Sequence, residues 1–297
     1  MTLIAILISL GVEKSVAMLQ EFRQFDWFTN FARWLRARLA RGAGGSLGVL
    51  LIVGLPVLAI GILYHVLNDL LGLLGFAFAT LVLIFSLGPQ NLDEQVQAYI
   101  DAREIGDTEA AHHIATDILH EQLPGSAFQL TRAVTESILV QANERVLAVL
   151  FWFAVLGPVG AILYRLSCIL RNGTAKEQHP SGEFAQAATR LHATLDWVPA
   201  RLAALGYAVS GSFVDAIGNW RGSAGKWAGN WEASSVGVLL ASGMGALQLD
   251  VEHAEGATEL DVQGEINQIK SAQALIWRTL VVWILIIALM TLAGWAG

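Results

Sequence analysis

A carboxylate, an amide and a guanidinium lie together just before a long apolar block of the sequence. Glu136 and Asn143 are two helical turns apart and would share a face of a helix, and Arg145 follows closely. A carboxylate and an amide on one face at a membrane mouth can hold Mg²⁺ or a polar ligand, because polar groups near hydrocarbon are usually kept for a function. The alternative is an ordinary polar helix end with solvated charges.

A second set of candidate residues is the run Leu-Asp-Trp-Val-Pro-Ala-Arg-Leu at 195–202. Pro199 suits the first turn of a helix, which would place the Asp196 carboxylate beside free amides and the positive end of the helix dipole. Arg201 would then bind a phosphate or carboxylate with two parallel hydrogen bonds. A helix cap followed by an interfacial arginine explains the same spacing.

Two further features have residue types that can do chemistry. Glu13 follows a mostly apolar start of the chain, so it is either a buried functional acid or the point where a short helix leaves the bilayer. His113, Asp117 and His120 recur at helical spacing, as ligands of Zn²⁺ can. No second pair of ligands accompanies them, which favours a solvated helix face. The sequence therefore assigns no metal and no cofactor.

The elements that must position these residues are membrane-spanning helices. Of the 297 residues, 55% are hydrophobic and 14% are charged, against about 25% charged in a soluble domain. The mean hydropathy is +0.54. The apolar residues fall into blocks that are each long enough, at about 1.5 Å per residue, to cross about 30 Å of hydrocarbon. These blocks are 47–67, 70–87, 146–170 and 274–295.

This pattern predicts an all-α, polytopic helical membrane protein with about four transmembrane spans and helical cytoplasmic loops. Only Asn68 and Asp69 separate the first two blocks, which predicts a helical hairpin with a tight turn. Gly157 and Pro158 lie inside the third block, where glycine loosens a helix and proline removes a backbone donor. We therefore expect the third span to be kinked or broken.

The expected segments follow from these blocks. The hairpin returns the chain to its starting side, so the loop after it shares a compartment with the N-terminus. The segments are 1–46 (N-terminal apolar segment and basic interfacial helix), 47–87 (transmembrane hairpin), 88–145 (cytoplasmic helical loop), 146–170 (kinked third span), 171–273 (second loop with re-entrant or interfacial segments) and 274–297 (C-terminal span).

Arginines before the first span indicate the orientation. Five arginines between positions 23 and 41 are interleaved with apolar residues at helical spacing, which predicts a basic amphipathic helix in the interface. The positive-inside bias then places this end and the 88–145 loop in the cytoplasm. Basic residues favour the same side for the 171–273 loop, although long loops follow this bias poorly.

Charge and cysteine content exclude several classes of protein. The net charge of −7 makes a nucleic-acid partner unsuitable, because phosphate contacts need clustered Lys and Arg. The single cysteine, Cys168, excludes an internal disulfide and a cysteine-based metal cluster. The phosphate-binding loop, the dinucleotide-binding glycine pattern and the usual hydrolase motifs are absent.

Several stretches of the chain resemble a known family. They are 136–161, with its Leu-Gly-Pro-Val-Gly, the run at 195–202, the stretch 87–99 and the first 13 residues. Over most of its length the chain is similar to the AmpE family, and the Asp-Trp-Val-Pro-x-Arg-Leu run is the most specific part. This resemblance implies an inner-membrane signalling protein in the induction of chromosomal β-lactamase, linked with AmpD, an amidase that recycles cell-wall anhydromuropeptides.

The AmpE family is distantly similar to the CobD/CbiB family of adenosylcobinamide-phosphate synthases. Those enzymes join an aminopropanol (phosphate) arm to a corrinoid carboxylate with nucleotide help. Their pattern reads roughly Glu-Ser-x-x-Glu-Asn-x-x-Asp. In this sequence Glu136 and Ser137 match it, whereas the other three positions differ and hold Val140, Gln141 and Glu144.

A second region of that pattern is better matched. Asp196, Pro199 and Arg201 agree with the Pro-x-Arg region of the synthases. A ligase that activates a carboxyl group needs acids to hold Mg²⁺ and nucleotide. Their partial loss around Glu136 argues against synthase activity, whereas the matched residues imply that a ligand pocket survives.

The favoured hypothesis is a non-enzymatic sensor of the bacterial inner (plasma) membrane that modulates β-lactamase induction in connection with cell-wall recycling. Its expected partners are the lipid bilayer, a small anionic ligand, a cytoplasmic signalling protein and a second copy of the chain. Small residues on the spans permit such a homodimer. The candidate ligand-binding residues are Glu13, Glu136, Asn143, Arg145, Asp196 and Arg201.

The alternative hypothesis is a membrane-bound amide-forming enzyme of the cobinamide-phosphate synthase type that uses Mg-nucleotide. Glu136 and Asp196 would hold Mg²⁺, and Arg201 would bind phosphate. A transporter fits poorly, because the sequence shows a single broken span without an inverted partner. Stoichiometric nucleotide turnover would separate the enzyme from the sensor.

Overall fold

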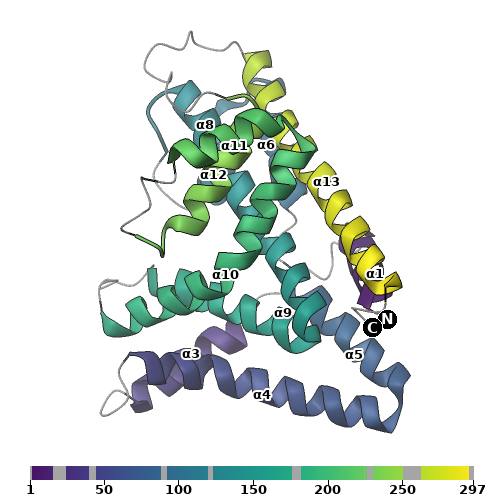
Figure 1. Cartoon of the computed structure of the whole chain (residues 1–297). Helices are drawn as coiled ribbons and strands as arrows, with labels where there is room; N and C mark the ends of the chain where they lie inside the picture. The colour runs from purple at the N-terminus through teal and green to yellow at the C-terminus, as the bar shows by residue number, and fades with distance from the viewer. Residues whose placement is uncertain are drawn as a thin grey trace. The chain divides into compact units, whose positions relative to one another are not determined.

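The structure is a computed structural model that describes residues 2–15, 25–39, 45–87, 92–119, 123–175, 182–223, 225, 230–249 and 262–293. Within these ranges the secondary structure is helical and contains no strand (Figure 1). The prediction of an all-α polytopic membrane protein is therefore confirmed. The helices are α1 (Thr2–Ser15), α3 (Asp26–Leu39), α4 (Ser46–Leu70), α5 (Gly72–Ser86), α6 (Leu92–Glu104), α7 (Thr108–Leu119), α8 (Ala127–Ala142), the π-helix η1 (Asn143–Leu147), α9 (Ala148–Ala175), α10 (Glu183–Ser210), α11 (Phe213–Ser223), α12 (Ser234–Ala246) and α13 (Val262–Leu292).

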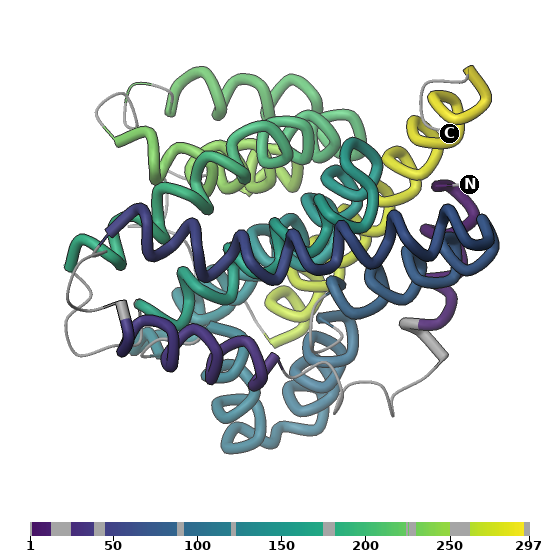
Figure 2. The backbone as a smooth tube through the Cα atoms, turned by 90° about the horizontal axis from the view of Figure 1, so that it is seen from below, coloured from purple at the N-terminus to yellow at the C-terminus, as the bar shows by residue number. Residues whose placement is uncertain are grey.

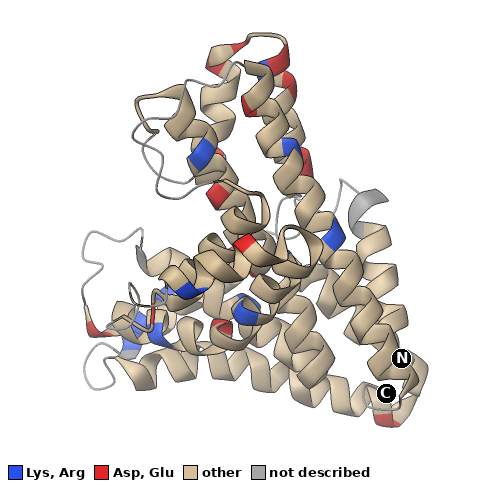
Figure 3. Cartoon of the chain, turned by 45° about the horizontal axis from the view of Figure 1, so that its top comes forward, with Lys and Arg blue, Asp and Glu red and all other residues tan. Residues whose placement is uncertain are grey.

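Three described stretches are long and apolar enough to cross a membrane: Ser46–Leu70, Ala127–Thr174 and Val262–Leu292. They correspond to three of the four predicted spans. The fourth, at 70–87, corresponds to α5, a shorter apolar helix. Helix α4 carries no Lys or Arg and a single acid, Asp69 (Figure 3). Its outer leucines, such as Leu50 and Leu58, are about two-thirds exposed, as lipid-facing side chains of a spanning helix are.

The turn of the hairpin lies two residues beyond the predicted position. Helix α4 continues through Asn68 and Asp69 to Leu70, and the chain reverses at Leu71, which has extended backbone angles (φ −155°, ψ 118°). The expectation that Asn68 and Asp69 form the turn is therefore wrong. Figure 2 shows the sharp bend that joins α4 to α5. The two helices pack against one another, so the hairpin itself is confirmed.

The predicted break in the third apolar block is present. Gly157 in α9 has φ 65° and ψ −150°, which only glycine adopts readily, and Pro158 follows. Three residues later, a Cβ on Gly160 would lie 2.3 Å from the carbonyl oxygen of Trp152. The bend thus depends on both glycines. Just before α9, η1 is a π-helical turn, a feature that often occurs at functional sites.

The described chain divides into two compact units. Unit 1 comprises 1–89, 144–199 and 286–297, and unit 2 comprises 90–143 and 200–285. In unit 1, helix α9 contacts α1, α3, α4 and α5, and the core includes Phe28, Ile52 and Leu166, each fully buried. The predicted amphipathic helix is α3, which buries Phe28 and leaves Trp27 and Trp34 half exposed.

Unit 2 is built around α8, which contacts α6, α7 and α12. Its core includes Tyr99, Val134 and Ile269. Helix α12 is rich in glycine and serine and is buried over most of its length. A Cβ on Gly243 would lie 2.7 Å from a methyl group of Leu139, so the small residues allow α12 to approach α8 closely. The start of α7 is capped, since the Ala110 amide donates to the Asp107 carboxylate at 3.0 Å.

Candidate functional site

A buried cluster of charged and polar side chains lies in unit 1, where η1, α9 and the first half of α10 come together. We call it the polar cluster. Its members come from within 144–199, so it belongs to one unit. They are Glu144, Arg145, Tyr164, Arg165, Ser167, Cys168, Arg171, His192 and Asp196.

Glu144 is paired within the cluster. Its side chain is 12% exposed, and Arg171 donates from Nη2 to both of its oxygens, at 2.9 and 3.1 Å. The thiol of Cys168 donates to Oε2 at 3.7 Å. His192 Nε2 lies 3.9 Å from Oε1. An ion pair with so little solvent access needs additional hydrogen bonds, and the Cys168 thiol supplies one.

Asp196 has a different partner. The hydroxyl of Tyr164 donates to Oδ1 of Asp196 at 2.7 Å, and both side chains are buried. Sequence reasoning placed Asp196 at the start of a helix. Pro199 and Asp196 instead lie well inside α10, which begins at Glu183. That expectation was wrong, because a proline is also tolerated within a helix whose neighbours cover the freed carbonyl.

His192 is buried beside Arg171. The Oγ of Ser167 lies 3.3 Å from its Nδ1, and Nε2 has no hydrogen-bond partner among the described residues. Burial, and then the positive charge of Arg171, lower the pKa of His192 to about 3. The imidazole is therefore neutral at physiological pH and orients its neighbours rather than accepting a proton from bulk solvent.

Arginine is in excess in the polar cluster. Arg165 is 3% exposed, and its Nε and Nη2 have no hydrogen-bond partner among the described residues. Arg145 interacts electrostatically with Arg165, with Glu144 and with Cys168. A buried guanidinium with unsatisfied donors costs several kcal/mol unless an anion meets it. The arrangement is suited to a carboxylate or phosphate, which a guanidinium binds with two parallel hydrogen bonds.

The structure assigns the predicted site residues to different surroundings. Arg145 and Asp196 are members of the polar cluster, whereas Glu136, Asn143 and Arg201 belong to unit 2. Glu136 forms an ion pair with Arg132, one helical turn away, at 2.9 Å. Ligand binding by these residues stays a prediction.

The remaining predicted residues have the following places. Asn143 is fully buried at the start of η1, and Arg201 Nη2 donates to Ser234 Oγ at 3.4 Å. Glu13 lies in α1, but its side chain is outside the described part of the structure.

The histidines at helical spacing form a separate case. His120 lies outside the described residues. His113 and Asp117 form an exposed pair at 3.6 Å. No group of three His, Cys, Asp or Glu that could hold a metal occurs among the described residues.

Sequence reasoning missed the members of the cluster that make it distinctive. Arg165 lies inside an apolar block of 146–170, and an ionisable residue within a span is itself a signal of function. Glu144 occupies the last position of the Glu-Ser-x-x-Glu-Asn-x-x-Asp pattern and is still an acid. Arg171 and His192 carried no signal, since their partners are distant in sequence.

Two other positions of that pattern, Ser137 and Gln141, have a structural role in unit 2. Gln141 donates from Nε2 to the carbonyl oxygen of Ile118 and to Ser137 Oγ, each at 2.6 Å. Ser137 donates to the same carbonyl oxygen at 3.1 Å. These bonds join α8 to the end of α7. Gln141, which stands in place of the Asn of the pattern, therefore still forms polar contacts at this point.

Comparison with known proteins identifies the relatives of this chain. The family described as CobD/Cbib protein matches residues 3–275. The chain belongs to the CobD/CbiB family. It is 31% identical over 251 residues to the cobalamin biosynthesis protein CobD of Stutzerimonas stutzeri (strain A1501), a match that covers 81% of this chain and 80% of the relative. It is 30% identical over 167 residues to the CobD of Chromobacterium violaceum, covering 56% and 52% of the two chains. No solved structure matches at comparable significance.

Membership of the CobD/CbiB family corrects two expectations from the sequence. The AmpE assignment, and with it a signalling role in β-lactamase induction, is wrong, because the family match and the curated relatives are cobalamin biosynthesis proteins. The expectation of a non-enzymatic protein is wrong for the same reason, since these relatives indicate a biosynthetic enzyme. The distant similarity to the synthases was the informative part of the resemblance.

Proposed function

We propose that this protein is a membrane-bound enzyme of cobalamin biosynthesis that forms an amide between a corrinoid carboxylate and the amine of aminopropanol or its phosphate, at the expense of Mg-nucleotide. Family membership supports the biosynthetic role. The observation that carries the site assignment is the excess of buried arginine around Arg165. The reaction requires a site that attracts anions, because a carboxylate, a nucleotide and a phosphate are all negatively charged.

The polar cluster supplies that electrostatic environment. Joining a carboxylate to an amine releases one water equivalent, and coupling to a nucleotide transfers that oxygen to the released phosphate. Arg165 and Arg145 would bind the anionic reactant and stabilise the negative charge that develops on it. Tyr164 holds Asp196 in place, and the ion pair with Arg171 holds Glu144. Mg²⁺ commonly uses one or two carboxylates together with substrate phosphates, so it would need no larger group of acids than this.

The proposed location is the inner membrane of a bacterium, with the arginine-rich side in the cytoplasm, where nucleotide is available. Three helices of spanning length support a membrane protein, and the positive-inside bias supports this orientation. A homodimer and the cytoplasmic side of 171–273 stay predictions. The orientation is tested by labelling single-cysteine variants in 88–145 and 171–273, in intact cells, with membrane-impermeant and membrane-permeant thiol reagents.

The test of the proposed activity uses the purified full chain in detergent, with a corrinoid acid, aminopropanol phosphate and Mg-ATP. Mass spectrometry follows the amide product, and nucleotide turnover is measured in parallel. The relative from Stutzerimonas stutzeri, prepared in the same way, is the positive control for substrates and detergent. We expect product and nucleotide turnover in equal amounts. Product from the relative but none from this folded chain would contradict the proposal.

A further inference from the structure

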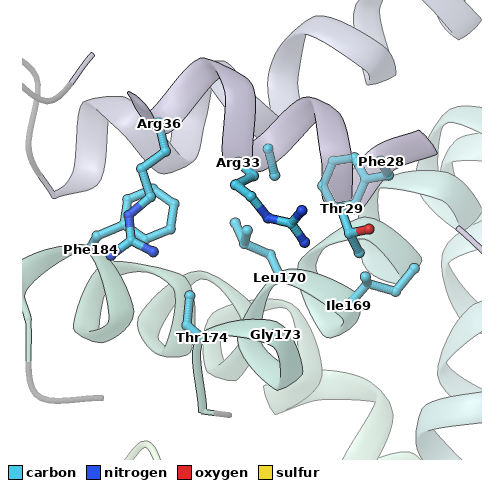
Figure 4. Close-up of a pocket in the computed structure, with 10 residues that line it drawn as sticks. Phe28, Thr29, Arg33, Arg36, Ile169, Leu170, Gly173, Thr174 and Phe184 are labelled. Atoms are coloured by element: carbon cyan, nitrogen blue, oxygen red, sulfur yellow. The ribbon is translucent and has the colours of Figure 1, made fainter. Parts of the chain in front are cut away.

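A pocket lined by two arginines lies in unit 1, apart from the residues of the polar cluster. It is formed by α3, the C-terminal end of α9 and the start of α10 (Figure 4). Its volume is about 140 Å³. That is well below the roughly 300–1,000 Å³ of sites for drug-sized ligands. The pocket is therefore too small for a corrinoid ring and is suited to a compact group.

Two guanidinium groups give the pocket its charge. Figure 4 shows Arg33 reaching from α3 into the space between α3 and α9. Its Nη1 donates to Asn30 at 3.4 Å, which uses one of the five donors of a guanidinium. Arg36 lies over the ring of Phe184, with 4.6 Å between its Cζ and the ring centroid, so its fork is held in one orientation. The described residues that line the pocket include no Asp or Glu.

The two hydroxyl groups of the pocket donate to backbone carbonyl oxygens. Thr29 donates to the carbonyl oxygen of Asp26 at 3.0 Å, and Thr174 donates to that of Arg171 at 2.8 Å. The cationic groups that line the pocket are thus the two guanidiniums. Two guanidiniums in a pocket of this size match the charge and the oxygens of a phosphate group.

The helix that carries these arginines is suited to the membrane interface. Trp27 and Trp34 on α3 are each 52% exposed, and tryptophan favours the level of lipid headgroups. The apolar, spanning-length helix α4 begins a few residues after α3. A phospholipid headgroup would therefore be close to the pocket.

We propose that this pocket binds a phosphate group through Arg33 and Arg36, as an anionic phospholipid headgroup or as the same group on a water-soluble phosphate. The site is independent of the proposed amide-forming activity. It would fix α3, and with it the start of unit 1, against the lipid surface.

The test measures binding of phosphatidylglycerol, phosphatidylcholine and inorganic phosphate to the delipidated full chain in neutral detergent, by native mass spectrometry and thermal shift. Ligand that binds the folded state raises the melting temperature. We expect phosphatidylglycerol to bind in preference to phosphatidylcholine. Arg33→Gln and Arg36→Gln should each weaken binding about ten-fold or more, because a hydrogen bond to a charged group is lost.

The matched control is Arg38→Gln, which removes the same charge from the same helix. Arg38 lies over Trp34, with its Cζ 4.7 Å from the ring centroid, and does not line the pocket. Binding retained in R38Q and weakened in R33Q supports the pocket. If inorganic phosphate binds and phosphatidylglycerol does not, the ligand is a water-soluble phosphate rather than a lipid headgroup. Equal weakening in R33Q, R36Q and R38Q would show general electrostatic attraction and overturn the proposal. So would the absence of binding to any of the phosphate compounds.

Discussion

The two units of this protein use buried charge in different ways. In unit 2, each described ion pair of a Lys or Arg joins one cation to one carboxylate. In the polar cluster of unit 1, three arginines accompany two carboxylates, and donors of Arg165 have no hydrogen-bond partner among the described residues. Matched pairs stabilise a packed structure, whereas a buried excess of one charge is retained where a ligand of the other charge binds. Among the described residues of unit 2, the Lys and Arg pairs are the part-buried Arg103–Glu265 and Arg132–Glu136 and the more exposed Lys270–Glu104.

The largest expected effect on stability is in unit 2. The side chains of Arg103 and Glu265 are 15% and 4% exposed, so Arg103→Met leaves a buried carboxylate without its cation. We expect unfolding to become easier by about 3–5 kcal/mol, measured by thermal or denaturant unfolding in detergent. The double variant R103M/E265M should recover most of this loss. An R103M protein as stable as wild type would contradict the comparison, because the Arg103–Glu265 pair would then not stabilise unit 2.

A smaller effect distinguishes two buried tyrosines. Tyr164 in unit 1 donates to the Asp196 carboxylate, and Tyr207 in unit 2 donates to the backbone carbonyl oxygen of Leu139, both at 2.7 Å. Tyr164→Phe should cost about 1.5–3 kcal/mol and Tyr207→Phe about 1 kcal/mol, because bonds to charged groups are stronger. Both variants lose one hydroxyl, so each is the control for the other. Equal losses would indicate that Asp196 is not held as an anion by this bond.

A further effect is a dependence on pH, which accumulates over several pH units. The pKa of His192 is about 3 in the folded state, below its value of about 6.5 in the unfolded chain. The unfolded state therefore binds more protons between pH 6.5 and 3, so His192 makes stability fall as pH decreases through this range, by up to about 1.4 kcal/mol per unit. In His192→Asn the melting temperature should depend less on pH between 6.5 and 4.5. The control is His113→Gln, whose side chain is 80% exposed; the same change in both variants would contradict the account.

Much of the fold could be predicted from the sequence, because hydropathy and backbone chemistry are local. The apolar blocks, the break at Gly157 and the cap at Asp107 depend on neighbouring residues alone. The turn at Leu71 and the continuous helix through Pro199 were mispredicted, since packing against other helices overrides local preference there. Local signals thus gave the elements but not their ends.

The site was predicted only in part. Arg145 and Asp196 were recognised, because both lie in conspicuous polar runs next to apolar blocks. Arg171 and His192 are 27 and 48 residues from their partner Glu144 in sequence, and no periodicity relates residues so far apart. Arg165 was overlooked, although its position inside an apolar block was visible. The departures around Glu136 suggest loss of enzymatic function, but similarity over most of the chain outweighs three positions of one pattern.

Steady-state kinetics of amide formation by Arg165→Gln tests the central claim most directly, with Arg190→Gln, an exposed arginine of α10, as control. The account predicts that R165Q lowers kcat/KM about 100-fold or more, as removal of a donor to a developing anion does, while its melting temperature without ligand stays at or above that of wild type. R190Q should keep the activity of wild type. An R165Q protein that is folded and as active as wild type would contradict the assignment of the polar cluster as the anion-binding site.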